Sequence, residues 1–152
     1  MAISNEEVIE MLKASYNMEL ETVLNYIANS TNPDGVRAEE IKKSLAADII
    51  EELGHAQQLA NRIKQLGGFV EGSAALKFGS QVQPSKTTTD VQAVIKAVIA
   101  AEETACAQYK KIIKAVEGED YVTQDMCVRL LADEEGHLIL FKGFLKEYSG
   151  QA

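Results

Sequence analysis

Apolar residues recur at helical spacing in four long segments of the chain, and turn-forming residues separate those segments. We expect helices over about residues 5–30, 36–66, 90–117 and 121–148, each with one apolar face. At ~1.5 Å per residue, each helix would be about 40 Å long, which is enough for a four-helix bundle. The pattern therefore predicts an all-α protein.

The ends of these segments carry helix-capping signals. The spacing of a capping box occurs twice, in Ser4/Glu7 and in Thr89/Gln92. Asp120 precedes the fourth segment, where its carboxylate would accept a hydrogen bond from the first helical turn. Gly67 and Gly68 follow the second segment in the manner of a C-cap.

The connections between the segments predict the topology. The first and third connections are short, so the helices that they join should form antiparallel hairpins. The middle connection, residues 67–89, is 23 residues long, which is unusual inside a compact domain unless the loop has a task. That task would be to run along the bundle and start the second hairpin at the opposite end. We therefore expect a single domain over residues 1–152, with two antiparallel hairpins joined by one long crossover.

Composition and charge narrow the class of protein. Of the 152 residues, 46% are hydrophobic and 25% are charged, which is typical of a globular protein and not of a disordered one. Two cysteines are too few for a disulfide scaffold. The N-terminus lacks the features of a signal peptide, and no apolar run approaches the ~20 residues that span a bilayer, so we expect a cytoplasmic protein without a membrane partner. The net charge of −8 argues against nucleic acid as a partner and favours cations.

The two histidines occupy equivalent positions in the second and fourth segments. Each follows a glutamate by three residues, so both side chains of a pair project from one helix face. The preceding helix of each hairpin has a glutamate on its apolar face and a tyrosine seven residues later. These residues form two sets, Glu19/Tyr26 with Glu52/His55 and Glu102/Tyr109 with Glu134/His137. The two glutamates of a set are 33 residues apart in the first half and 32 in the second, so the chain is a duplicated hairpin.

Packing the two hairpins about a pseudo-twofold axis would bring four glutamates and two histidines to the bundle centre. Without counter-charge, each buried carboxylate would cost on the order of several kcal/mol in desolvation and would repel the others. Two divalent metal ions would supply the missing charge, and the mixed carboxylate and imidazole ligands suit iron or manganese, and zinc less specifically. The expected metal ligands are Glu19, Glu52, His55, Glu102, Glu134 and His137. The alternative is a metal-free bundle with surface ion pairs.

The ligand on the third helix has a competitor in the next residue. Glu102 shares its helical stripe with Val98 and Tyr109, whereas Glu103 shares its stripe with lysines. We therefore assign Glu102 to the metal site and Glu103 to solvent.

The chain resembles the bacterioferritin branch of the ferritin-like superfamily over most of its length. The resemblance lies in Asn17-Met18-Glu19-Leu20 with Tyr26, Glu52-Leu53-Gly54-His55, and Asp120-Tyr121-Val122 through Asp133-Glu134-Glu135-Gly136-His137. It implies a ferritin-like four-helix bundle in which the six residues bind two iron ions, with Glu52 and Glu134 bridging them and each histidine binding one. It also implies that Glu51 and Asp133 orient the histidine rings, although a solvated helix face explains these two residues equally well. Tyr26 is interpreted as a bundle aromatic with a satisfied hydroxyl in preference to a redox residue.

The chain also departs from this family. Bacterioferritins bind haem through a methionine where this chain has Leu53, which cannot ligate iron, so we expect no haem. The chain ends directly after the fourth segment, with little room for the short fifth helix of many ferritin-like cages. A Dps-like dodecamer or a smaller oligomer therefore stays open beside a 24-subunit shell. One Dps-like group places two cysteines near its di-iron site, but Thr104 and Gln124 stand at those positions here, so Cys106 and Cys127 are interpreted as buried free thiols.

The leading hypothesis from this resemblance is a ferroxidase that oxidises Fe(II) with dioxygen or peroxide and stores Fe(III) in a homo-oligomeric shell. The alternative is a non-storage di-metal oxidase or peroxide reductase of the rubrerythrin type, although the chain lacks the Cys-x-x-Cys iron domain that rubrerythrins usually carry. A metal-free interaction bundle is the third hypothesis. DNA protection of the Dps type is disfavoured, because there is no lysine-rich tail and the net charge has the wrong sign.

Overall fold

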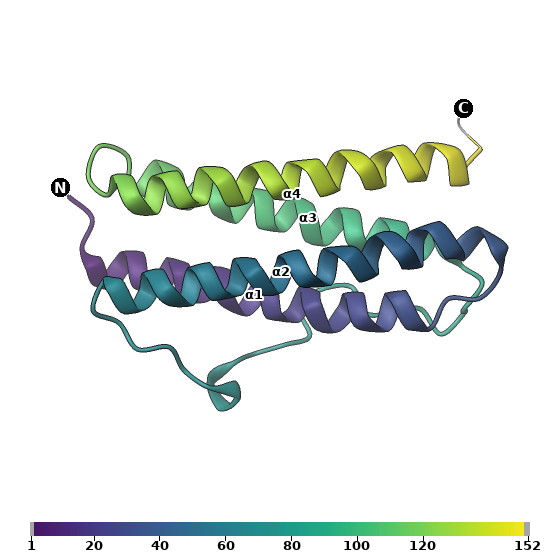
Figure 1. Cartoon of the computed structure of the whole chain (residues 1–152), viewed down its shortest axis with the longest axis horizontal. Helices are drawn as coiled ribbons and strands as arrows, with labels where there is room; N and C mark the ends of the chain where they lie inside the picture. Colours follow the sequence, from purple (N-terminus) through teal and green to yellow (C-terminus); the bar gives the residue numbers. More distant parts are fainter. Residues whose placement is uncertain (1, 151–152) are drawn as a thin grey trace.

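The computed structural model describes residues 2–150 and contains four long α-helices (Figure 1). The helices are α1 (Asn5–Thr31), α2 (Glu39–Gln65), α3 (Val91–Ala115) and α4 (Tyr121–Tyr148). Two single 3-10 turns, η1 (Val36–Ala38) and η2 (Ser73–Ala75), lie in the connections. The described residues contain no β-strand. Three residues lie outside the described part of the chain: Met1, Gln151 and Ala152.

Three of the expected helix caps are confirmed. The Ser4 hydroxyl accepts a hydrogen bond from the Glu7 N–H at 3.2 Å, and the Glu7 carboxylate accepts one from the Ser4 N–H at 2.8 Å. This reciprocal pair begins α1. At α4, the Asp120 carboxylate accepts a hydrogen bond from the backbone N–H of Thr123 at 3.0 Å. Gly67 follows the C-cap residue of α2, Leu66, and has φ +92°, a backbone conformation that glycine adopts without a steric cost.

The expected capping box of α3 is wrong. The carboxylate of Asp90 caps the helix, accepting a hydrogen bond from the Ala93 N–H at 3.1 Å. The Gln92 amide instead donates to the backbone carbonyl of Tyr148 at 2.8 Å. The capping box of Thr89 and Gln92 does not form, because Asp90 follows Thr89 and its carboxylate accepts the hydrogen bond from the first turn of the helix. The start of α2 also differs from the prediction, since residues 36–38 form η1 and the α-helix begins at Glu39.

The topology agrees with the prediction. α1 packs along α2 and α3 packs along α4, and each pair is antiparallel (Figure 1). The crossover, residues 66–90, runs past α1 from one end of the bundle to the other and enters α3 there. The protein is thus an all-α bundle of two hairpins with one long crossover.

Two apolar clusters fill the bundle on either side of its middle. One contains Leu12, Leu59, Ile63, Ile112 and Leu130, all at most 1% exposed. The other is built around Ile41, Leu45, Ile95 and Phe141, each 0% exposed. On each helix the residues between the two clusters include buried charged groups. None of the helices in the described part of the chain is long and apolar enough to cross a bilayer.

A buried carboxylate fastens the crossover to α1. Glu21 is 2% exposed, and its Oε1 accepts hydrogen bonds from the backbone N–H groups of Gly79 at 2.9 Å and Ser80 at 3.3 Å. Its Oε2 accepts one from the Gln81 N–H at 2.5 Å. The crossover therefore has a fixed path at this point, because three consecutive N–H groups converge on one charged side chain.

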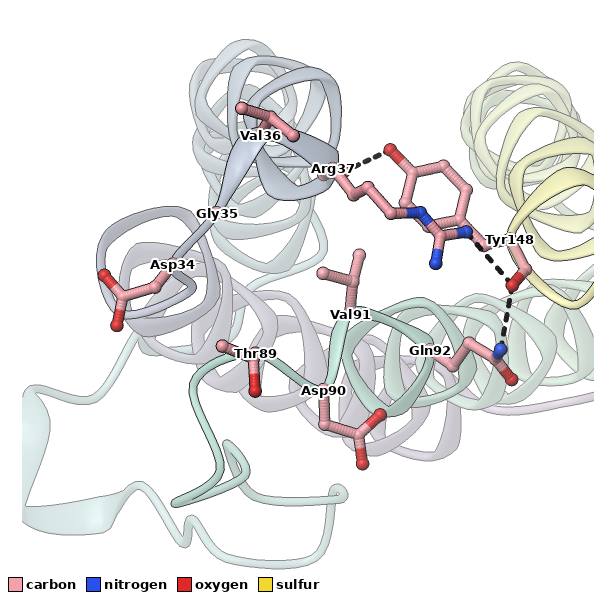
Figure 2. Close-up of a pocket in the computed structure, with 9 residues that line it drawn as sticks. All are labelled: Asp34, Gly35, Val36, Arg37, Thr89, Asp90, Val91, Gln92 and Tyr148. Atoms are coloured by element: carbon pink, nitrogen blue, oxygen red, sulfur yellow. Dashed lines mark hydrogen bonds between the residues drawn. The ribbon is translucent and has the colours of Figure 1, made fainter.

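The end of the bundle opposite the N-terminus is closed by contacts among three segments (Figure 2). The Arg37 guanidinium lies 4.5 Å from the centre of the Tyr148 ring and donates a hydrogen bond to the Tyr148 carbonyl at 3.2 Å. The Tyr148 hydroxyl donates in return to the Arg37 carbonyl. These contacts join the α1–α2 connection to the last turn of α4, beside a cavity of about 360 Å³.

Candidate metal centre

The six predicted ligands meet in the middle of the bundle. α1 and α3 each supply one glutamate, and α2 and α4 each supply a glutamate and a histidine. The four glutamates are 0–2% exposed, His55 is 1% exposed and His137 is 8% exposed. All the positions that the duplicated motif selected are thus brought together by the fold.

The six side chains form two overlapping groups of four, each of which could hold a metal ion. One group is Glu19, Glu52, His55 and Glu134, and the other is Glu52, Glu102, Glu134 and His137. Ligand atoms within each group lie within 4.8 Å of one another. Glu52 and Glu134 belong to both groups and are therefore shared between them.

The oxygens of the shared glutamates divide between the two groups. Glu52 turns Oε2 toward His55 Nδ1, at 3.4 Å, and Oε1 toward His137 Nδ1, at 3.3 Å. Glu134 does the same, with Oε1 at 2.8 Å from His55 Nδ1 and Oε2 at 3.9 Å from His137 Nδ1. Each shared carboxylate therefore offers one oxygen to each half of the centre.

The inward-facing atoms of this centre fit a pair of cations. Six of them are buried without a hydrogen-bond partner: Glu52 Oε1 and Oε2, Glu102 Oε2, Glu134 Oε1, His55 Nδ1 and His137 Nδ1. His55 Nδ1 and Glu134 Oε1 approach closely but do not have hydrogen-bond geometry. Since buried polar atoms are normally paired, this converging set of oxygen and nitrogen donors has the chemistry of a metal site.

Burial controls the electrostatics of the centre. It raises the pKa of Glu19 well above its usual range, and it raises that of Glu134 to about 11, although the contact with His55 opposes the shift. Burial alone would lower the pKa of His137, but the neighbouring carboxylates of Glu102 and Glu52 outweigh it and raise this pKa to about 12. As long as no other positive charge is present in the centre, some of its groups therefore keep their protons.

Each histidine is oriented by a carboxylate from the other hairpin. His55 Nε2 on α2 lies 3.0 Å from Asp133 Oδ2 on α4, and His137 Nε2 on α4 lies 2.9 Å from Glu51 Oε2 on α2. With Nε2 donating to these carboxylates, Nδ1 is the nitrogen that turns inward, and it would offer a lone pair to a metal ion that displaced its proton. Of the two interpretations of Glu51 and Asp133, the contacts favour orientation of the rings over a solvated face.

The two tyrosines also cross between the hairpins. The Tyr26 hydroxyl donates to Glu102 Oε1, and the Tyr109 hydroxyl donates to Glu19 Oε1. Tyr26 is thus a bundle aromatic with a satisfied hydroxyl, as interpreted from the sequence. Glu19 and Glu102 each belong to only one of the two groups of four ligands. Each tyrosine hydroxyl is bonded to one carboxylate oxygen of these glutamates, which leaves the other oxygen to face the centre.

A family model described as a ferritin-like domain matches residues 9–150. The chain belongs to the ferritin family. A bacterioferritin of Brucella melitensis is 32% identical to it over 133 residues, which cover 87% of this chain and 78% of that protein. A DNA protection during starvation protein of Pyrococcus furiosus is 25% identical over 148 residues, which cover 94% of this chain and 79% of that protein.

Solved structures show the same ferritin fold. A dodecameric thioferritin from Bacteroides fragilis has a TM-score of 0.90 and 22% identity, covering 98% of this chain and 90% of that one. A ferritin-like, diiron-carboxylate protein from Bacillus anthracis has a TM-score of 0.82 and 23% identity, covering 95% of this chain and 99% of that one.

In this ferritin, the residues that were assigned away from the metal site also lie where they were expected. Glu103 is exposed, and its carboxylate lies 3.7 Å from Lys142 Nζ. Cys106 and Cys127 are both buried and unbonded. Burial raises the pKa of the Cys127 thiol to about 12, so neither its position nor its chemistry is that of a reactive cysteine.

Sequence reasoning missed Asp48, which lies next to the centre of this ferritin. Asp48 is 7% exposed, and its Oδ1 lies 3.5 Å from His137 Nε2. Burial raises the pKa of Asp48 to about 6, and the neighbouring histidine opposes this shift. The signal for it was present, because Asp48 precedes Glu52 by four residues and therefore shares its helix face.

Proposed function

We propose that this chain is a ferroxidase of the bacterioferritin type, which oxidises Fe(II) and stores Fe(III) in a homo-oligomer. The observation that carries the proposal is the set of six buried, unpartnered donor atoms, which point inward from five residues of the predicted ligand set. The two overlapping groups of ligands support two iron ions per chain. The names of the bacterioferritin relatives and of the diiron-carboxylate structure agree with this assignment.

The residues of the chain would have distinct roles in this reaction. Glu52 and Glu134 would bridge the two Fe(II) ions, while Glu19 with His55 and Glu102 with His137 would each hold one. Two Fe(II) ions would together give up two electrons, which with two protons from water would reduce dioxygen to hydrogen peroxide, or hydrogen peroxide to two water molecules. The tyrosine hydroxyls would hold the carboxylates of Glu19 and Glu102 in place, and burial of the ligands would exclude bulk water from the ions.

A homo-oligomer is supported by the outer faces of the first hairpin. Four apolar side chains on α1 and α2 are 47–76% exposed: Leu24, Ile27, Ile50 and Leu53. The structural relative from Bacteroides fragilis is a dodecamer. We propose a closed shell of this kind, either a dodecamer or a 24-mer, in which these side chains become buried.

The test compares two adjacent glutamates of α3. Glu102→Gln removes a proposed ligand, whereas Glu103→Gln changes an exposed glutamate one residue away and serves as the matched control. We expect the rate of Fe(II) oxidation, followed by the absorbance of the ferric product, to fall at least ~100-fold in the first variant, since even changes to the partners of metal ligands cost 10–100-fold. The control should keep the wild-type rate. Equal rates in both variants would reject the site.

Storage is tested by sizing the protein after aerobic Fe(II) loading and counting iron per subunit. Tens to hundreds of irons per chain in a particle of several hundred kilodaltons would support a storage shell. Two irons per chain in a small oligomer would instead support a di-metal oxidase or peroxide reductase without storage. Absence of metal from freshly purified protein, together with no Fe(II) oxidation, would support a metal-free bundle.

A further inference from the structure

The crossover is bonded to α1 on both sides of the proposed ligand Glu19. Two residues before Glu19, the Asn17 side-chain amide exchanges two hydrogen bonds of 2.7 Å with the backbone N–H and carbonyl of Lys77. Two residues after Glu19, the buried Glu21 carboxylate accepts three backbone hydrogen bonds from the same stretch of the crossover. We call residues 77–81 the clamp, because they hold the turn of α1 that carries this ligand.

The side chain of Gln81 completes the clamp. Its Nε2 donates to the backbone carbonyl of Met18 at 3.2 Å and to the Thr22 hydroxyl at 2.9 Å. Its Oε1 accepts a hydrogen bond from Asn25 Nδ2 at 3.3 Å. Met18 directly precedes Glu19, so one side chain of the clamp bonds the helix backbone next to the ligand itself.

The equivalent turn of α3, which carries Glu102, has no clamp. At the positions that correspond to the clamped residues of α1, this helix has Ala100, Ala101, Thr104, Ala105 and Gln108. The Thr104 hydroxyl donates within its own helix, to the Ala100 carbonyl, and Gln108 makes one hydrogen bond of 3.2 Å with the α1 backbone. Within residues 2–150, no hydrogen bond joins the crossover to this turn.

Free space also lies beside the turn of α3. A cavity of about 300 Å³ lies between the clamp and this turn, and Ala100, Ala101 and Thr104 line it on the α3 side. Atoms next to a cavity lack packing partners on that side, so the turn has room to shift. The two helices that supply one ligand each therefore differ, because α1 is tied to the crossover at its ligand and α3 is not.

We propose that the clamp positions Glu19 for metal binding before an ion arrives. The ion held by Glu19 and His55 would therefore bind first and more tightly than the ion held by Glu102 and His137. The inference rests on the proposed function, because it takes the two groups of ligands to hold one ion each. A ligand that is already fixed in its bound position loses little conformational freedom on binding, so more of its interaction energy is realised as affinity. Glu102 would reach its final position only when its own ion binds, and Gln81 would act as a positioning residue for Glu19.

The wild-type protein provides the first test, with Co(II) as the probe. Anomalous diffraction from crystals of the full chain, supplied with one Co(II) per chain, gives the occupancy of each group. We expect most of the cobalt in the group of Glu19 and His55. Amide hydrogen exchange of the metal-free protein gives a second readout, in which residues 20–24 should exchange more slowly than residues 103–107, and Co(II) should slow exchange chiefly in the second range.

Replacing Gln81 tests the clamp directly. Gln81→Ala removes the contacts with Met18 and Thr22 but keeps the backbone N–H that bonds Glu21. We expect the affinity for the first Co(II), measured by its visible absorption, to fall at least ~10-fold, while the affinity for the second stays unchanged. Gln83→Ala is the matched control, because Gln83 is exposed and its amide bonds only within the crossover, to the Gln81 carbonyl. It should bind both ions as the wild type does.

The outcomes separate the clamp from the proposed function. Equal occupancy of the two groups in wild-type crystals, or a preference for Glu102 and His137, would overturn the clamp and leave the dinuclear centre intact. An equal loss of both ions in Gln81→Ala would show a merely structural role for this residue and would also contradict the inference. Co(II) in neither group would overturn the proposed function and the inference together. The wild-type diffraction result does not depend on whether the variant folds.

Discussion

Replacing Glu21 tests whether the crossover is held by one buried carboxylate. Glu21→Ala removes the acceptor of three backbone hydrogen bonds, from residues 79, 80 and 81. Hydrogen bonds to a charged group contribute about 1.5–3 kcal/mol each, which would give roughly 4–9 kcal/mol for three. Gly79 and Ser80 are exposed, so water replaces part of this loss. We therefore expect a decrease of about 3 kcal/mol in the free energy of unfolding.

A second substitution separates charge from hydrogen-bond geometry. Glu21→Gln keeps one oxygen as an acceptor but places an amide N–H₂ group against a backbone N–H. Oε2 lies 2.5 Å from the Gln81 nitrogen, so two donors would face each other there, and we expect a loss of about 2 kcal/mol. Glu10→Ala on the same helix is the control and should change stability by less than ~0.5 kcal/mol, because Glu10 is exposed.

Urea unfolding of the metal-free protein at one fixed concentration measures these differences, since oligomerisation would otherwise change the apparent stability. Amide hydrogen exchange at residues 79–81 gives an independent readout, and protection there should fall in Glu21→Ala. The reasoning would be refuted by a Glu21→Ala variant within ~1 kcal/mol of the wild type that retains this protection. In that case other contacts of the crossover, such as the two 2.7 Å hydrogen bonds between Asn17 and the backbone of Lys77, would be sufficient to hold it.

Three further predictions concern regions outside the centre. Burial opposes ionisation of Asp120, but hydrogen bonds within its turn and the Arg62 guanidinium at 2.7 Å outweigh it and lower the pKa. Asp120→Ala should therefore lower the free energy of unfolding by about 1–2 kcal/mol at pH 7. A carboxylate whose pKa is lowered by folding stabilises the protein only above the pKa that it has in the unfolded chain. Urea unfolding should therefore show the difference between variant and wild type shrinking as the pH falls below about 4. Cys127, buried and with its pKa raised to about 12, should react with a thiol reagent at neutral pH only after denaturant is added; rapid labelling of native protein would contradict this. Arg37→Ala removes the cation–π contact and the hydrogen bond to Tyr148, so thermal melts should show a loss of about 1 kcal/mol, and an unchanged melting temperature would show that these contacts contribute little.

The ligand set was predictable because it repeats. Glu52/His55 and Glu134/His137 have the same spacing on equivalent helices, and helical geometry places each pair on one face. The four helices were predictable for a similar reason, since apolar residues at helical spacing must be buried against a neighbour. In both cases a local pattern determines the outcome.

The contacts between hairpins were not predictable from local patterns. The sequence placed Tyr26 near Glu19 on α1, but its hydroxyl bonds Glu102 on α3. The path of the crossover likewise depends on Glu21 meeting residues almost 60 positions later in the chain. Spacing along a helix gives the direction of a side chain but not the identity of the atom that it meets on another element. Asp48 was missed for a different reason, because it has no counterpart in the second half of the chain, where Leu130 stands at the equivalent position.

The exchange of partners between the hairpins makes each half of the centre depend on the other hairpin. His55 is oriented by Asp133 and Glu19 is held by Tyr109, so the first hairpin alone cannot complete its own half of the centre. The equivalents of these helpers, Glu51 and Tyr26, are nevertheless present in that same hairpin, where they serve the other half. Two copies of one hairpin related by a twofold axis would therefore contain every contact needed to build both halves. In these terms the long crossover is a tether that keeps two near-equivalent halves in one chain, and a tethered pair can carry an aspartate at position 48 of one half where the other has Leu130.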